Sequence, residues 1–270
     1  MKRKLILTFL ILLAFATAAM MAYMCLKNRD SSEFPLQDRP LKVAVLQDYK
    51  PFSYIDERTG ERTGFEFDLA NAMCETMKAS CTIVPTPYTE IISSLRDKKI
   101  DVAVVGMGAS EERKKFLAFS ETYLRSLLFF ITKDPELVPI QDTDIGGLIV
   151  GVWKDTLQHK RLARDFADTG LEVKTYQSNH DVIEGLLHGE VNMVLVDGLF
   201  GYALLKRPIA KNFLIAGNYP VVDSSLTDSK IAVDIDNKEM LGPINLALIQ
   251  LQASGELQKL LTKYFPYLDY

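Results

Sequence analysis

Residues 41–132 alternate short apolar segments with amphipathic ones, and this alternation narrows the possible folds more than any other feature. The apolar segments have the length of buried strands and lie at residues 43–46, 82–84 and 102–105. The segments between them, at residues 68–78 and 90–97, carry apolar side chains at helical spacing. Strands and helices in alternation predict a mostly parallel sheet covered by helices, an α/β fold.

A second unit of the same kind follows, and the chain then returns to the first. The second unit has expected strands at residues 149–153, 172–176 and 193–195, and expected helices at 156–168, 181–187 and 199–206. The return consists of a strand at 231–234 and helices at 240–253 and 257–264. The sequence therefore predicts lobe 1 from residues 41–132 plus 231–270, and lobe 2 from residues 133–230. Hinge segments are expected at about 127–133 and 226–231, because two linking segments between two lobes permit closure.

The N-terminus is expected to lie outside the fold. Three basic residues at positions 2–4 precede an apolar stretch at 5–26 and a linker at 27–40. Residues 1–26 fit either a cleaved signal peptide or a membrane anchor, and both alternatives export the rest of the chain. Cys25 adds lipidation as a third alternative. The predicted location is periplasmic or otherwise extracytoplasmic, with membrane contact only through this segment.

Composition argues against several classes of function. The formal net charge is −4, and no basic stripe interleaved with aromatic residues is present, so no nucleic-acid partner is expected. His159, His180 and His188 occupy expected helical positions without a nucleophile motif or metal-ligand spacing around them. No metal and no cofactor are therefore predicted.

The segment from Lys99 to Ser120 has the pattern of a carboxylate-binding site. An apolar strand ends at Gly106 and Gly108, and Ser110 is placed to cap a helical turn that carries Arg113. Glycine allows a ligand to approach the backbone closely, and the guanidinium matches the two oxygens of a carboxylate. The alternative is that Arg113 belongs to a solvated run of charged residues.

Five segments together resemble the bacterial extracytoplasmic solute-binding proteins for polar amino acids, family 3. They begin with the strand at residues 41–45 and its continuation Asp-Tyr-Lys-Pro-Phe-Ser-Tyr at 48–54, and the others lie at 63–70, 92–101, 99–120 and 255–265. The resemblance implies the type II periplasmic-binding-protein fold, with two lobes and a ligand cleft between them. It also implies an amino-acid ligand and the membrane permease of an ABC-type importer as partner.

The resemblance assigns roles to residues at the expected cleft. Arg113, the backbone N–H of Gly108 and the helix start at Asp155 and Thr156 would hold the ligand's carboxylate. The ammonium group would meet Asp197 and the carbonyl of Gly106. The ligand's side chain would contact three aromatic residues, Tyr49, Tyr88 and Trp153. Asp197 also fits an ordinary N-cap of the helix that follows it, and the two roles are compatible.

Three positions depart from the family pattern. Gly108 stands where many relatives have serine or threonine, so it lacks a hydroxyl for the ligand. Asp155 stands where glycine is common and puts a carboxylate near the anion site. Leu46 occupies the position of an aspartate in binders of lysine, arginine or histidine, which argues against a strongly basic ligand.

Cys74 and Cys81 are placed to form a disulfide. They are seven residues apart across an expected helix-to-strand turn, which can bring two Cα atoms within disulfide range. The same spacing occurs in some members of the resembled family. The alternative is a pair of buried free thiols.

The leading hypothesis is a non-enzymatic module that binds an amino acid and delivers it to an importer. One alternative is a cyclohexadienyl dehydratase-like enzyme, which shares the resembled fold. That enzyme carries an acidic residue three positions after its strand-end aspartate, and here the position is Phe200. We therefore expect no second titratable group placed to move a proton, and no catalysis. The other alternative is a membrane-tethered ligand-sensing domain.

Overall fold

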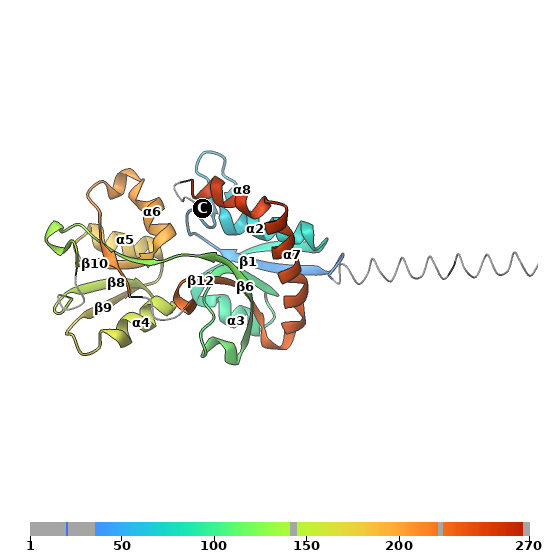
Figure 1. The fold of residues 1–270 in the computed structure, drawn as a ribbon, viewed down its shortest axis with the longest axis horizontal. Coiled ribbons are helices and arrows are strands. Elements are labelled where there is room, and N and C mark those ends of the chain that lie inside the picture. The colour runs from blue at the N-terminus through green and yellow to red at the C-terminus, as the bar shows by residue number, and fades with distance from the viewer. Residues whose placement is uncertain (1–19, 21–35, 141–144, 221–223, 267–270) are drawn as a thin grey trace, which may run out of the picture.

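The computed structural model describes residue 20 and residues 36–140, 145–220 and 224–266, which form two lobes joined side by side (Figure 1). The expected signal or anchor at 1–26 and most of the linker at 27–40 lie outside these ranges. Within the described ranges, no helix is long and apolar enough to cross a bilayer.

The first lobe is built on a five-stranded sheet in the order β4-β1-β5-β12-β6. These strands are Ser80–Thr86, Pro40–Leu46, Val102–Met107, Asp228–Asp234 and Leu117–Arg125, in that order. Its helices are α2 (Phe65–Thr76), α3 (Ile91–Arg96), α7 (Leu241–Ala253) and α8 (Glu256–Tyr264). Alternate residues of β1 are buried on opposite faces: Val43 and Val45 join the apolar cluster of α2, α7 and α8, whereas Ala44 and Leu46 join that of α3.

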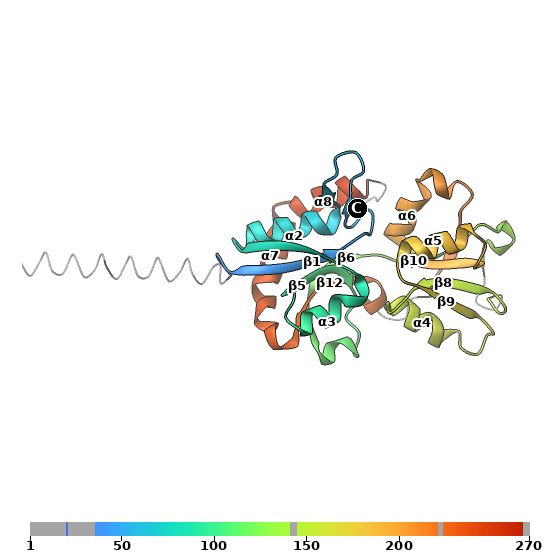
Figure 2. The ribbon, with the colours of Figure 1, turned by 180° about the vertical axis from the view of Figure 1, so that it is seen from behind.

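The second lobe has a five-stranded sheet in the order β11-β7-β10-β8-β9. The strands are Leu214–Asn218, Leu128–Thr132, Met193–Asp197, Ile149–Trp153 and Glu172–Tyr176. Its helices are α4 (Leu157–Asp165), α5 (Asn179–Leu187) and α6 (Gly198–Leu205). Figure 2, viewed from behind, shows α4 on one side of this sheet and α5 and α6 on the other.

Short elements complete the fold. A small hairpin joins β2 (Tyr54–Ile55) to β3 (Arg62–Thr63). The 3₁₀ turns are η1 (Tyr88–Glu90), η2 (Arg113–Lys115), η3 (Pro135–Leu137), η5 (Pro208–Ala210), η6 (Ser224–Leu226) and η7 (Ile235–Met240).

Both sheets are mixed, where the alternation predicted mostly parallel strands. In the first sheet, β4, β1 and β5 are parallel to one another, and β12 pairs antiparallel with both β5 and β6. In the second, β10, β8 and β9 are parallel, whereas β7 and β11 are antiparallel. The sequence reading missed β6 and β11 and treated β7 as part of a crossing.

The crossings between the lobes lie slightly earlier than the predicted boundaries. β7 pairs with β10 and β11, so residues 128–132 belong to the second sheet rather than to lobe 1. β12 begins at Asp228, inside the range predicted for lobe 2, and pairs with β5 and β6. The two crossings are hydrogen-bonded to each other, since the N–H of Ser126 donates to the carbonyl of Thr227 over 2.9 Å.

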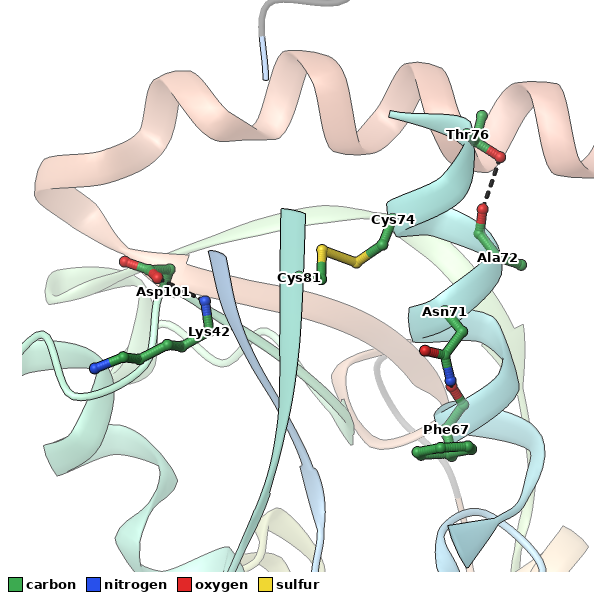
Figure 3. The surroundings of a disulfide bond; sticks show 8 residues. All are labelled: Lys42, Phe67, Asn71, Ala72, Cys74, Thr76, Cys81 and Asp101. Atoms are coloured by element: carbon green, nitrogen blue, oxygen red, sulfur yellow. Dashed lines mark hydrogen bonds between the residues drawn. A yellow bond between two sulfur atoms is a disulfide. The ribbon is translucent and has the colours of Figure 1, made fainter. Parts of the chain in front are cut away.

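A disulfide joins Cys74 near the end of α2 to Cys81 in β4, as predicted (Figure 3). Cys74 is buried at 6% exposure within the apolar cluster beneath α2. The bond closes a loop with a sequence separation of 7 and ties this helix to the edge strand of the sheet.

Replacing both cysteines with serine should lower the free energy of unfolding by roughly 2–3 kcal/mol, because the cross-link restricts the unfolded chain over a short loop. Urea unfolding of the oxidised wild type and of the double variant Cys74→Ser, Cys81→Ser measures this difference. The matched control is the wild type in reductant, which should unfold like the variant. Equal unfolding midpoints, or free-thiol peptides from exported protein mapped without reductant, would contradict the assignment.

Candidate functional site

The first turn of α2 is docked on the segment that follows β1. Gly64, the N-cap of this helix, has φ 131°, and a Cβ at that position would lie 2.3 Å from the carbonyl oxygen of Phe52. This close approach lets the N–H groups of Phe65 and Glu66 donate to the carbonyls of Pro51 and Phe52, over 2.9 Å and 2.8 Å. A side chain at position 64 would prevent it, so glycine is required here. Glu66 is consequently placed at the inner face of the lobe with no exposed surface.

Two adjoining cavities lie between the lobes. The first, which we call the aromatic cavity, has a volume of about 60 Å³, and the second, the arginine cavity, about 30 Å³. Both are lined by Tyr88, Gly106, Gln158, Asp197 and Ser229. The aromatic cavity adds Leu46, Tyr49, Glu66, Trp153 and Thr156 among others, and the arginine cavity adds Gly108, Arg113 and Ser225 among others. Residues predicted from both lobes therefore meet at one place.

Arg113 is buried, with 4% of its surface exposed, so it does not belong to a solvated run of charges. Ser110 Oγ accepts from the Arg113 N–H over 3.3 Å, as the predicted cap requires. The guanidinium donates to the carbonyl of Gly108 over 3.0 Å and to the hydroxyl of Tyr88 over 2.7 Å. It also reaches across to the carbonyl of Asp155 over 3.4 Å. These bonds fix a cation at the edge of the arginine cavity.

Position 108 requires glycine for a steric reason that the sequence did not reveal. A Cβ at this position would lie 1.9 Å from the carbonyl oxygen of Ser225 and 2.8 Å from Leu157 Cδ1. Ser225 belongs to η6, next to the returning crossing, and Leu157 begins α4. The space that a serine or threonine side chain would use is thus occupied by the second lobe and the returning crossing.

Asp155 and Thr156 lie at the start of α4, but only the side chain of Thr156 faces a cavity. Thr156 is buried, lines the aromatic cavity, and accepts from the N–H of His159 over 3.1 Å as the N-cap. Asp155 has φ 62°, in the left-handed region that favours glycine, and its side chain is exposed. It lines neither cavity, and it faces Arg113 through its backbone carbonyl.

Asp197 ends β10 and caps α6. Its Oδ1 accepts from the N–H groups of Leu199 and Phe200, over 2.9 Å and 3.1 Å. Burial raises the pKa of this carboxyl to about 6, against the lowering effect of those two N–H groups and the Ser126 hydroxyl. Asp197 also lines both cavities, so the capping role and a place in the cleft coexist.

Aromatic rings form much of the wall of the aromatic cavity. The ring of Tyr49 stacks on Phe52 at 4.7 Å and on Phe200 at 5.4 Å, and its edge meets Trp153 at 5.4 Å between centroids. Tyr88 lies 4.8 Å from Trp153. The predicted walls Tyr49, Tyr88 and Trp153 are therefore brought together from both lobes.

Several residues that line the cleft were not predicted from the sequence, among them Gln158, Ser229 and Glu66, and Glu66 is the one with the most unusual surroundings. Its Oε1 accepts from the hydroxyl of Tyr123 over 2.7 Å, and that hydroxyl accepts from the N–H of Gly106 over 2.9 Å. Its Oε2 is buried without a hydrogen-bond partner. Burial raises the pKa of Glu66 to about 8, the Tyr123 hydrogen bond lowers it, and the charge of Asp197 raises it. The cleft therefore contains a second titratable group besides Asp197, which the sequence did not predict.

The described residues hold no group of three or more histidine, cysteine, aspartate or glutamate side chains arranged for a metal ion. The chemistry available in the cleft is thus the guanidinium of Arg113, the carboxyl groups of Glu66, Asp197 and Asp228, side-chain amides, hydroxyls and aromatic faces. Opposite charges on adjoining walls suit a small zwitterion.

Residues 41–267 match the bacterial extracellular solute-binding proteins, family 3. The chain belongs to this family. An L-arginine-binding protein of Pseudomonas aeruginosa is 27% identical over 238 residues, which cover 85% of this chain and 89% of the relative. Two amino-acid-binding proteins with solved structures have a similar fold.

An ancestral arginine-binding protein bound to arginine is similar at a TM-score of 0.76 and 28% identity, covering 85% of this chain and 99% of its own. An ancestral amino-acid-binding protein, a precursor of cyclohexadienyl dehydratase, is similar at a TM-score of 0.71 and 25% identity, covering 84% and 95%. The family prediction is confirmed, and the named relatives are amino-acid-binding proteins rather than enzymes.

Proposed function

We propose that this protein binds a free α-amino acid between its lobes, outside the cytoplasmic membrane, and delivers it to the permease of an ABC-type importer. The observation that carries the proposal is the arginine cavity, which Arg113 and Asp197 line together. A buried cation and a carboxyl group on one small cavity match the two charged ends of an amino acid. The arginine-binding relatives support the ligand class.

The two ends would be held by different lobes. Arg113 follows β5 of the first lobe and would bind the carboxylate, with the free N–H groups at the start of α4 adding positive potential. Asp197 lies in the second lobe and would bind the ammonium, with the carbonyl of Gly106 as a further acceptor. An amino acid would therefore connect the lobes and favour the closed arrangement.

The wall of the aromatic cavity argues for a ligand side chain that is not strongly basic. Leu46 is buried at 2% exposure and lines this cavity at the position where binders of basic amino acids carry an aspartate. Tyr49, Trp153 and Leu46 together offer apolar contact to a side chain.

A thermal-shift screen of the common amino acids tests the proposed function. The ligand should stabilise the exported domain by about 2.7 kcal/mol at a hundredfold excess over its dissociation constant. Sugars and divalent metal ions serve as controls and should give no shift. A clear shift with a sugar or a metal, and none with any amino acid, would reject the assignment.

Arg113→Ala and Asp197→Asn should each weaken binding by roughly 2–5 kcal/mol, or tens- to thousands-fold, because each removes one partner of a buried charge pair. Asparagine keeps an acceptor for the N–H groups that Asp197 caps, so α6 should stay folded. Lys114→Ala is the matched control, since Lys114 is an exposed neighbour paired with Glu111. Calorimetry that finds wild-type affinity in Arg113→Ala would contradict the anion site.

Glu66 supports a second candidate, dehydration of prephenate or arogenate. A buried carboxyl group with a raised pKa can serve as a general acid, and it lines the same cavity as Asp197. The similarity to a dehydratase precursor adds to this reading. The position that carries the acidic residue in the dehydratase is Phe200, which packs on Tyr49 here, so we place binding first.

Incubation with prephenate or arogenate should give no aromatic product, as measured by ultraviolet absorbance. The reason is that Phe200 puts an apolar ring where the dehydratase has its acid. A boiled sample and Glu66→Gln are the controls. Turnover by the wild type that is lost in Glu66→Gln would replace the binding proposal with the enzymatic one.

A further inference from the structure

We propose that Glu66 is a second acidic group of the ammonium subsite, and that a bound amino acid displaces the proton that Glu66 holds in the empty protein. The inference rests on the proposed function, because it places a ligand ammonium group in the cleft. It adds a residue for which the family resemblance provided no role, and it makes binding depend on proton release.

Glu66 lies beside Gly106, whose carbonyl is assigned to the ammonium group, and lines the same cavity. Its carboxyl oxygen Oε1 lies 3.1 Å from the point where a side chain on Gly106 would begin, and Ser229 Oγ lies 3.6 Å from the same point. Oε1 is already bonded to Tyr123, which leaves Oε2 as the free acceptor in a fully buried side chain. Asp197 lines the same cavity. A buried oxygen without a partner is costly unless a ligand supplies one.

The surroundings of Glu66 are acidic or neutral. Tyr123 faces it from β6, the charge of Asp197 on β10 raises its pKa, and the neutral phenol of Tyr49 after β1 is close enough that the charge of Glu66 raises the pKa of Tyr49. On α8, Lys263 and Tyr264 bind Asp68 of α2 instead. Among the described residues, no salt bridge involves Glu66. The protein itself therefore supplies no cation to neutralise this carboxylate.

The absence of a neutralising cation determines the protonation state of Glu66 before and after a ligand binds. Burial raises the pKa of Glu66 to about 8, so the neutral acid predominates in the empty cleft at pH 7. A ligand ammonium neutralises Asp197 and approaches Oε2, and both effects favour the ionised form. The O–H bond of Glu66 breaks, its electron pair stays on the carboxylate, and the proton passes to the solvent buffer. The ammonium group keeps its own protons.

The first arm of the test uses the empty protein. Between pH 7 and pH 8, above the pKa of about 6 of Asp197, the folded state still holds a proton on Glu66 that the unfolded chain has already released, so stability falls as the pH rises. The folding equilibrium constant should drop by up to about tenfold per pH unit in this window, measured by urea unfolding. Glu66→Gln should remove this dependence. Glu75→Gln, on the exposed face of the same helix, should keep it.

The second arm uses an equimolar mixture of the common L-amino acids as the probe. The mixture is added to saturation to weakly buffered protein at pH 7. Binding should then release close to one proton per protein molecule, measured with a pH indicator dye. Glu75→Gln should release the same amount, and Glu66→Gln should release almost none while still showing a thermal shift. Release that persists in Glu66→Gln overturns the proposal.

The two arms separate the possible failures. A thermal shift without proton release overturns the Glu66 subsite and leaves the amino-acid function standing, whereas no thermal shift overturns both. If Glu66→Gln does not fold, Tyr123→Phe decides the matter. Loss of the Tyr123 hydrogen bond should move the midpoint of the stability profile to higher pH, because that bond lowers the pKa of Glu66. An unmoved midpoint overturns the proposal.

Discussion

The hydrogen bond between the N–H of Ser126 and the carbonyl of Thr227 holds the two crossings together, and the site depends on it. It lies where β6 leads to β7 and where the chain returns into β12. Ser126 also accepts, through Oγ, from the N–H of Leu199 at the start of α6. The outgoing crossing is therefore bonded directly to the first turn of α6, the helix that Asp197 caps.

The site is assembled from the beginnings of helices. α2 contributes Glu66, α4 contributes Thr156, and α6 is capped by Asp197. The N–H groups at these ends are used differently. At α2 they bind backbone carbonyls, at α6 they bind Asp197, and at α4 Thr156 occupies one of them. Of these three helices, α4 keeps N–H groups at its start that can add positive potential for a carboxylate, next to Arg113.

The sequence predicted those features that depend on local pattern. The parallel strands and most helices lie at the expected places. Arg113 was predicted from the strand and glycine turn before it and Asp197 from the family resemblance, and both line the arginine cavity. The antiparallel strands β6, β7 and β11 were missed because their partners are distant in the chain. Glu66 was missed for a related reason. A glutamate in the first turn of a helix is ordinarily an exposed partner of the helix dipole, and only the docking of Gly64 against Phe52 buries it.

Burial of Glu66 also connects the charge of the cleft to closure. The cavity that Glu66 lines is formed by both lobes, since it includes Val152 and Trp153 of β8 as well as Phe52 of the first lobe. Desolvation is the largest cause of its raised pKa. Separation of the lobes would admit water to this cavity and return the pKa of Glu66 toward its ordinary value. The proton that Glu66 holds in the empty protein therefore depends on the lobes lying together, as they do in this structure.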